Sequence, residues 1–200
     1  MTTRKPTGER RREIADAAIK IIGERGLREF TAAQIAREVG IKDGTIFRHF
    51  KDMAEITRAV LDRLQEQIGA SPPQPAGNPL ERLEAFVLGR LHAVSTQPGI
   101  QSLVFSDQIS HALGEEGPQR VAALRNRSRE YIRSCLRDAD AEGLLREGLD
   151  LDAAVLLVSG TVMGFMFALK DGALPAPSAE METRSWQLLQ SALAREQGTA

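Results

Sequence analysis

Apolar residues recur at helical spacing along most of the chain, beginning close to the N-terminus. Ile14, Ala18, Ile21 and Ile22 fall at i, i+4, i+7 and i+8, which places them on one face of a helix. Gly26 follows them and is a residue type that commonly ends helices. The pattern predicts a first helix that buries this face and supports the segments after it.

A second helical pattern begins at Thr31 and ends at Gly40. Thr31 and Gln34 have the spacing of a capping box, in which each side chain bonds a free backbone N–H at the helix start. Gly40 supplies the left-handed position that ends the helix, so a tight turn should follow. The apolar face of this helix consists of Ile35, Ala36 and Val39.

The next segment, residues 44–50, places Ile46 and Phe50 four positions apart and facing the preceding helix. Its polar residues point the other way, as in a recognition helix lying in a DNA major groove. An arginine can donate two hydrogen bonds to guanine, and threonine or histidine can reach base edges or phosphates. A solvated polar face without DNA binding is the alternative. The polar residues are Thr45, Arg48 and His49.

Charge is distributed unevenly along a nearly neutral chain. The formal net charge is −1, but the first twelve residues carry +4, which suggests an arm that contacts phosphates. Residues 1–67 contain 14 basic and 11 acidic side chains, whereas residues 68–200 contain 12 and 16. A solvated tail is the alternative for the arm. Its basic residues are Arg4, Lys5, Arg10, Arg11 and Arg12.

Together these segments resemble the DNA-binding domain of the tetracycline-repressor (TetR) family of bacterial transcription regulators. The matching pieces are REIADAAIKIIGERG, FTAAQIAREVGI and GTIFRHF, followed by a new helix from Asp52. The resemblance covers residues 11–64, and the remainder resembles the family only in length and helical character. It implies DNA binding through Thr31, Ala33, Arg37, Lys42, Gly44, Thr45, Phe47, Arg48, His49 and Lys51.

Three positions depart from the family pattern. Phe47 stands where a tyrosine commonly reaches a phosphate, and Met53 stands where a phosphate-binding lysine commonly begins the fourth helix. We expect Lys51 to substitute for that lysine. Lys42 replaces a small capping residue, and Asp43 is expected to cap the recognition helix in its place.

Beyond the head, the chain contains only helical patterns, so we predict an all-α protein of about nine helices. Residues 69–79 contain four prolines and two glycines, which predicts a loop. Asn78 and Pro79 form a cap and first-turn pair for the next helix. We predict a DNA-binding domain over 1–52 and a helical ligand-binding and dimerisation domain over 53–200. Its helices should lie near 80–96, 100–113, 118–142, 151–170 and 179–196.

Ala153–Leu169 contains no charge across seventeen residues, so a membrane span must be considered. The run is shorter than the ~20 apolar residues that a bilayer requires. We favour a buried helix whose small residues let a partner helix approach closely, and we expect a homodimer and no membrane partner. The alternative is that these helices only complete a monomer core. The expected interface is Val155, Ser159, Gly160, Met163 and Gly164, with Trp186, Leu188, Leu189 and Leu193 on the last helix.

The family resemblance implies further that the last two helices of each subunit form a four-helix bundle. The two recognition helices would then lie about one DNA turn, ~34 Å, apart on a near-palindromic operator. It also implies a repressor that a small apolar or amphipathic effector releases from DNA. The candidate effector-binding residues are Phe86, Phe105, Tyr131, Met163 and Phe167.

The remaining chemistry-bearing residues point to no cofactor. His49, His92 and His111 show no metal-ligand spacing with each other or with Cys135, so we predict no metal. Cys135 is the only cysteine, which excludes an internal disulfide and favours a cytoplasmic protein. The sequence contains no phosphate-binding glycine loop and no hydrolase or metalloprotease motif, so we predict no enzyme. The rival function is a helical protein-interaction adaptor without sequence-specific DNA binding.

Overall fold

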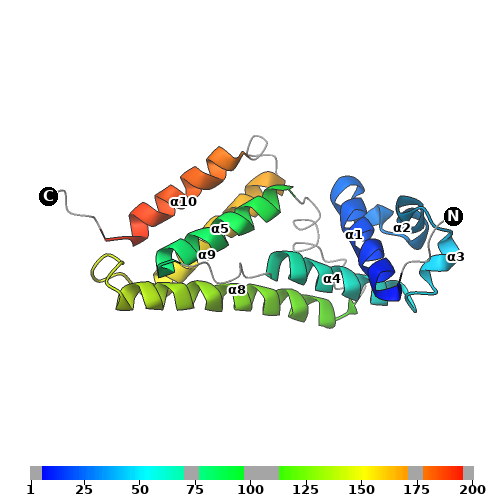
Figure 1. The fold of residues 1–200 in the computed structure, drawn as a ribbon, viewed down its shortest axis with the longest axis horizontal. Helices are drawn as coiled ribbons and strands as arrows, with labels where there is room; N and C mark the ends of the chain where they lie inside the picture. Colours follow the sequence, from blue (N-terminus) through cyan, green and yellow to red (C-terminus); the bar gives the residue numbers. More distant parts are fainter. Residues whose placement is uncertain (1–5, 70–76, 97–112, 171–177, 196–200) are drawn as a thin grey trace. The chain divides into compact units, whose positions relative to one another are not determined.

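The computed structural model describes residues 6–69, 77–96, 113–170 and 178–195 of the 200-residue chain. Within these ranges every regular element is a helix, as Figure 1 shows, which confirms the predicted all-α class. The one β-type contact in this part of the chain is an isolated bridge between Leu145 and Ala194.

The described chain divides into two compact units, of which the first contains the N-terminal helices. In this unit α1 packs against α2 and α4, and α2 packs against α3. The order of short and long helices is the one predicted for a helix-turn-helix head. The elements are α1 (Thr7–Arg25), the 3₁₀ turn η1 (Leu27–Glu29), α2 (Ala32–Val39), α3 (Asp43–Ile46), α4 (Met53–Gly69) and the start of α8 (Glu116–Ala141).

The hydrophobic stripe of α1 forms the centre of the first unit. All four residues predicted from its periodicity are buried, and Gly26 ends the helix at a φ of 82°. The start of α4 is also as predicted, because the Asp52 carboxylate accepts a hydrogen bond from the Glu55 amide at 2.8 Å. The buried stripe residues are Ile14, Ala18, Ile21 and Ile22.

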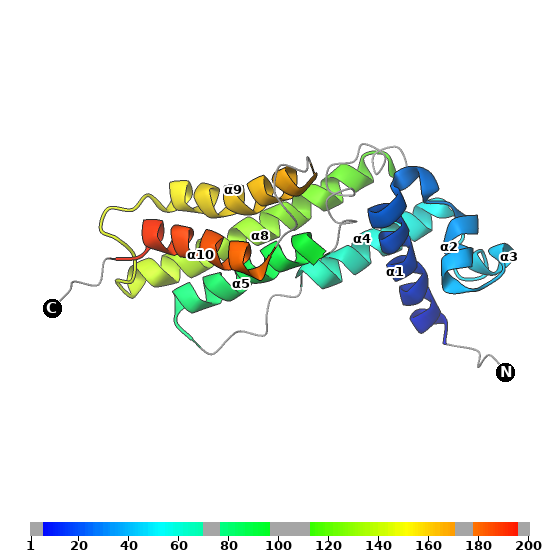
Figure 2. The same cartoon turned by 90° about the horizontal axis from the view of Figure 1, so that it is seen from above.

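The second unit contains α5 (Pro79–Thr96), the rest of α8, α9 (Leu151–Lys170) and α10 (Ala179–Leu193). In Figures 1 and 2, α5 runs beside α9 and α10, and all three pack on one another. These helices confirm the predicted ones to within a few residues. The helix expected over 100–113 lies almost entirely outside the described residues.

Capping residues explain where α5 begins. Asn78 Oδ1 accepts hydrogen bonds from the amides of Leu80 and Glu81 at 2.9 and 3.0 Å. The Glu81 carboxylate accepts one from the Asn78 amide at 3.1 Å, which completes a reciprocal capping box. The predicted Asn78 cap is therefore confirmed.

The last helix is shorter than predicted. It ends at Leu193 rather than near residue 196, because the chain turns extended at Ala194. There the backbone bonds a second segment: Arg146 donates to the Leu193 carbonyl at 3.0 Å, and Arg195 donates to the Leu144 carbonyl at 2.9 Å. Helical periodicity in the sequence does not reveal this competing pairing.

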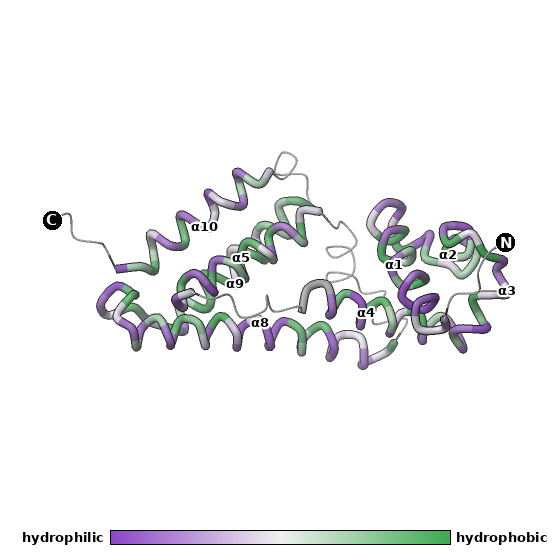
Figure 3. The backbone as a smooth tube through the Cα atoms, viewed as in Figure 1, coloured by the Kyte–Doolittle hydropathy of each residue, from purple (hydrophilic) through white to green (hydrophobic). Residues whose placement is uncertain are grey.

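Helix α9 is the most hydrophobic of the described helices. Leu151–Leu169 is long and apolar enough to cross a membrane, a test that core helices of soluble proteins also pass. One side of α9 is buried, whereas Leu156, Leu157 and Phe167 are exposed. Figure 3 shows a contrasting pattern on α10, where hydrophilic and hydrophobic residues alternate along the helix. An apolar surface thus remains on α9 after the unit has folded.

Candidate nucleic-acid interface

The helix-turn-helix is built around two local signals. The Thr31 hydroxyl accepts a hydrogen bond from the Gln34 amide at 3.3 Å, and Gly40 adopts a left-handed conformation with φ 73°. The reciprocal half of the predicted capping box is absent. Gln34 instead donates from its side chain to Glu29 at 2.9 Å, and the Thr31 amide bonds the Glu29 carbonyl at 2.8 Å. The Thr31 N–H, which the Gln34 side chain was expected to bond, is therefore satisfied by the Glu29 carbonyl of the preceding 3₁₀ turn.

The recognition segment begins at Asp43 and is shorter than a full helix. Helix α3 ends at Ile46, and hydrogen-bonded turns continue it through Phe50. Lys42 occupies the N-cap position without a side-chain cap, so the expected capping by Asp43 is wrong. The extended backbone of Lys42 leaves Asp43 inside the first turn, where its carboxylate favours the positive helix end.

The apolar face of this segment is buried as predicted. Ile46 and Phe50 are buried with Ile35 and Ala36 of α2 in the first unit. Phe47 is 50% exposed, which is unusual for a large aromatic side chain on a small domain. Eight of the ten predicted DNA-binding residues are exposed, namely Thr31, Ala33, Arg37, Lys42, Gly44, Phe47, Arg48 and Lys51, while Thr45 and His49 are half-buried.

His49 is less available than the helical pattern suggested. Its Nδ1 atom is shielded from solvent and has no hydrogen-bond partner among the described residues. Its backbone carbonyl accepts a hydrogen bond from the Arg11 guanidinium. Arg48, by contrast, is exposed beside it.

Arg11 of α1 contacts the C-terminal end of the recognition segment. Its guanidinium lies 4.1 Å from the ring centre of Phe50 and donates to Glu55 at 2.8 Å, in addition to the His49 carbonyl. It therefore ties α1 to the end of the recognition segment and to α4. The prediction of a free phosphate-seeking arm is wrong for Arg11.

Arg10 and Arg12 of the expected arm also belong to a helix, but they differ in their contacts. Helix α1 already begins at Thr7, so residues 10–12 are helical rather than part of a tail. Arg10 pairs with Glu13 at 2.8 Å, whereas Arg12 is exposed. Arg4 and Lys5 lie outside the described residues.

Glu55 is the acceptor that organises the start of α4. The Lys51 amide donates to its carboxylate at 2.6 Å and Arg11 donates at 2.8 Å. The pKa of the Glu55 carboxyl is lowered, mostly by the hydrogen bond from the Lys51 amide and next by the one from Arg11. Because the backbone of Lys51 is fixed in this way, its exposed side chain projects from a defined position.

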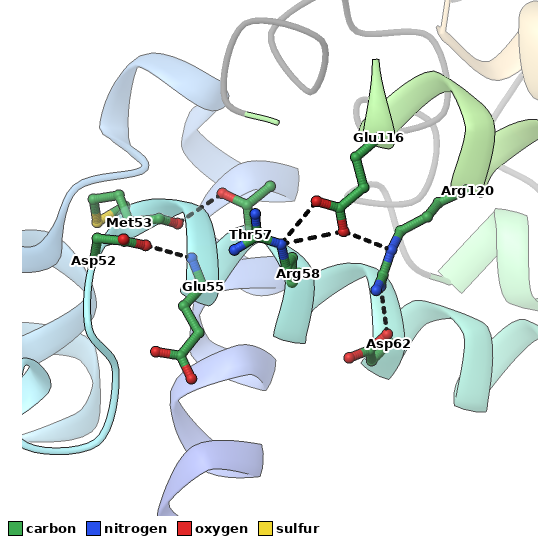
Figure 4. Close-up of polar contacts among 8 residues, drawn as sticks. All are labelled: Asp52, Met53, Glu55, Thr57, Arg58, Asp62, Glu116 and Arg120. Carbon is green, nitrogen blue, oxygen red and sulfur yellow. Dashed lines mark hydrogen bonds and ion pairs between the residues drawn. The ribbon is translucent and has the colours of Figure 1, made fainter. Parts of the chain in front are cut away.

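A charged network connects α4 to the start of α8 within the first unit, as Figure 4 shows. Arg58 donates to Glu116 at 2.9 Å, and Glu116 also pairs with Arg120 at 3.1 Å. Arg120 in turn reaches Asp62 at 2.7 Å. The hydrogen bond that Arg58 donates to the Glu116 carboxylate raises the pKa of the Arg58 guanidinium. The amino-acid sequence does not predict this network, because the paired residues are 58 positions apart and no local pattern links them.

Only part of the predicted effector-binding set is brought together. Phe86 of α5 and Tyr131 of α8 stack with ring centres 4.7 Å apart and planes tilted by 36°. Met163 is half-buried on α9, and Phe167 is 45% exposed. Phe105 lies outside the described residues.

Several residues of the predicted dimer interface are buried inside the subunit and are not on its surface. Val155, Trp186, Leu189 and Leu193 are buried in the subunit's own core, so their side chains are not available to a partner. Gly160 and Gly164 are exposed, and Ser159 and Met163 are half-buried. Of the predicted interface residues, Leu188 on α10 is the large apolar side chain that is exposed (73%). Leu156 (68%), Leu157 (47%) and Phe167 on α9 are also exposed, and the prediction did not include them.

Cys135 is buried beside Tyr131, and burial raises the pKa of its thiol. A protonated, buried thiol is a poor nucleophile, which argues against a redox role. In the described ranges, no group of three or more His, Cys, Asp or Glu side chains is arranged to hold a metal ion.

Comparison with known proteins places this head in a recognised group. The family model described as bacterial regulatory proteins, tetR family, matches residues 14–60. The chain is 32% identical over 163 residues to the HTH-type transcriptional regulator SrpR of Pseudomonas putida, across 80% of this chain and 74% of that protein. It is 26% identical over 156 residues to the HTH-type transcriptional repressor KstR2 of Mycobacterium tuberculosis, across 76% and 77%.

A solved structure shows the same fold. A putative transcriptional regulator from Saccharomonospora viridis in complex with choline aligns with a TM-score of 0.77 and 19% sequence identity, across 94% of this chain and all of that one (100%). The relatives are transcriptional regulators rather than enzymes.

Proposed function

The chain belongs to the TetR family of bacterial transcriptional regulators, and we propose that it is a repressor that binds a near-palindromic operator as a homodimer. One observation carries this proposal: the recognition segment buries Ile46 and Phe50 and exposes Arg48. The relative KstR2 is named as a repressor, which supports the direction of regulation. Such a protein would act in the cytoplasm, where the bacterial chromosome lies.

In this proposal, Arg48 is the main residue that recognises the DNA base sequence. Its exposed guanidinium can donate two hydrogen bonds to the O6 and N7 atoms of guanine. Thr45 and the half-buried His49 contribute from the same side. Phe47 cannot donate a hydrogen bond, but its exposed ring can pack against a sugar or a thymine methyl group.

Phosphate contacts would come from the exposed cations around the segment. Lys42 precedes α3 and Lys51 follows the recognition segment, so they flank the reading side chain. Arg37 on α2 and the exposed Arg12 on α1 add positive charge on the same unit. Contacts of this kind fix the register of a protein on DNA without reading sequence.

The exposed apolar residues of α9 and α10 support dimerisation. Leu156 and Leu188 are each more than two-thirds exposed in the single chain, which is costly in water. A side chain added at Gly160 or Gly164 would meet no atom within 4 Å, so a partner helix has room to approach this face. We assign the face to a second copy of the chain rather than to lipid, because a dimer places two heads on one palindrome.

Effector binding would act by shifting a conformational equilibrium. A ligand that prefers the conformation with badly spaced heads lowers DNA affinity by the ratio of its affinities for the two states. The stacked Phe86 and Tyr131 offer an apolar wall for such a ligand. The choline bound in the Saccharomonospora viridis protein supports a small-molecule effector in this fold.

Salt dependence of DNA binding tests the proposal against the adaptor alternative. Affinity for genomic DNA fragments, followed by fluorescence anisotropy, should fall steeply as salt concentration rises, because phosphate contacts release counterions. Arg48→Ala should reduce the preference for particular fragments. An adaptor would show no measurable DNA affinity at any salt concentration.

A further inference from the structure

Helix α5 carries two arginines, eight residues apart, that meet different partners on α8. Arg82 donates to the Asp138 carboxylate at 2.6 Å. Arg90 makes one described hydrogen bond, a long one of 3.5 Å from Nη2 to the Ser128 hydroxyl. Among the residues that the structure describes, no carboxylate pairs with Arg90.

The Nε donor of Arg90 is unused, next to an Nη2 group whose one described hydrogen bond is long. Its Nε atom is shielded from solvent and has no hydrogen-bond partner in the described part of the chain. The Nε of Arg82 is also unbonded, but the charge of that side chain is balanced by Asp138. Arg90 therefore combines a shielded donor with an unbalanced positive charge.

The surroundings of Arg90 are aromatic. Its guanidinium carbon lies 4.5 Å from the ring centre of Phe86, which stacks on Tyr131. Burial lowers the pKa of Arg90 to about 10, so the side chain is still protonated at neutral pH. A buried charge without a partner destabilises the fold, and a bound anion would relieve that cost.

We propose that Arg90 binds the carboxylate of an effector whose apolar body lies against Phe86 and Tyr131. This inference rests on the proposed function, since it names the chemistry of the molecule that would release the regulator from DNA. The Nε–Nη2 edge of a guanidinium matches the two oxygens of a carboxylate. Arg63 uses this edge in the same chain, bonding Asp16 at 2.7 and 3.3 Å.

A carboxylate fits better than the other charged groups. Arg90 supplies one positive charge, which a carboxylate balances, whereas a phosphate monoester would bring close to two negative charges. The other arginine of α5, Arg82, is already paired with Asp138. A cationic ligand would be repelled.

The test compares ligands that share a tail and differ in headgroup. Thermal unfolding of the full-length protein is measured with decanoate, decanol, decyltrimethylammonium and decyl phosphate, and with 4-phenylbutyrate as an aromatic carboxylate. A carboxylate should raise the unfolding midpoint of the wild type, and decanol and decyltrimethylammonium should not. Arg90→Met should weaken carboxylate binding by about tenfold or more, the value expected for a charged hydrogen-bonded pair.

Arg137→Met is the matched control, because Arg137 is exposed on α8 and should leave carboxylate binding unchanged. Equal effects of decanoate and decanol, equal binding by Arg90→Met, or no response to either carboxylate would overturn the proposal. Stronger stabilisation by decyl phosphate would overturn the carboxylate assignment. If Arg90→Met does not fold, the carbon-13 signal of labelled carboxylate bound to the wild type decides, since pairing with Arg90 requires it to stay ionised well below its usual pKa.

DNA release separates this inference from the proposed function. The carboxylate that binds should release wild-type protein from operator DNA, while Arg90→Met should bind the same DNA and resist release. Carboxylate binding that depends on Arg90, without any DNA binding, would support the site and reject the regulator. DNA binding without a carboxylate response would reject the site alone.

Discussion

At the scale of single residues, Arg11 and Arg48 of the head differ in exposure, and we propose different roles for them. Arg11 is engaged by Phe50, Glu55 and the His49 carbonyl on one side of the recognition segment. Arg48 is exposed on the segment itself. The same residue type thus stabilises the fold at one position and is proposed to read DNA at the other.

Arg48 and Lys51 are expected to give different signatures when each is changed to alanine. Arg48→Ala should cost about 1–3 kcal/mol of binding free energy and relax the preference at one base position, because a base contact is lost. Lys51→Ala should weaken binding to all sequences alike and reduce the salt slope by about one. Anisotropy titrations against an operator and its single-base variants measure both. An unchanged affinity for Arg48→Ala would show that this face does not read DNA.

Glu55 should make stability depend on pH. Its folded pKa lies below the usual 4.5, so its contribution is present above that value and is lost as pH falls through the lowered pKa. Urea unfolding should therefore show Glu55→Gln less stable than the wild type near neutral pH, with the difference shrinking in acid. Asp140→Asn, at an exposed position on α8, serves as the control. A difference that is constant with pH would contradict the role of the ionised carboxylate.

At the scale of secondary-structure elements, the turn at Gly40 sets the geometry of the reading head. Gly40 adopts φ 73°, and its amide caps α2 through the Arg37 carbonyl at 3.2 Å. Helix α3 is only four residues long, so its placement depends on this turn and on burial of Ile46.

Gly40→Ala should therefore destabilise the head by about 1–2 kcal/mol, the cost of placing a side chain in a left-handed conformation. Denaturant unfolding measures the loss. Gly8→Ala is a matched control, because Gly8 lies in the exposed first turn of α1, where φ is not positive and nothing crowds the position. Equal stability of the wild type and Gly40→Ala would mean that the turn relaxes without strain.

Helix positions and the buried side of α1 were predictable from the sequence, whereas the partners of Arg11 and the exposed side of α9 were not. The stripe of α1, the Thr31 cap and the Gly40 end all follow from local residue spacing. Arg11 could not be placed, because its partners lie 38 and 44 residues away. Apolar residues occur all round α9, so periodicity could not show that Val155 faces the core and Leu156 faces out.

At the scale of the whole molecule, the proposed dimer links the exposed apolar face to operator spacing. Leu188→Arg should shift the protein toward monomer, because a charge cannot be buried in an apolar interface without a partner. Sedimentation velocity measures the change, and Gln187→Arg at the neighbouring exposed position is the control. A Leu188→Arg protein with unchanged mass in solution would place the dimer interface elsewhere.

Selection of bound sequences from genomic fragments shows directly whether the protein recognises a specific operator. The regulator account predicts enrichment of a near-palindromic site whose half-sites lie about one helical turn, ~34 Å, apart. The same selection with Arg48→Ala should enrich a site that has lost its preference at one base position of each half-site, with salt-dependent binding to DNA retained. Micromolar binding that is equally tight for all sequences, with no enriched palindrome, would contradict it.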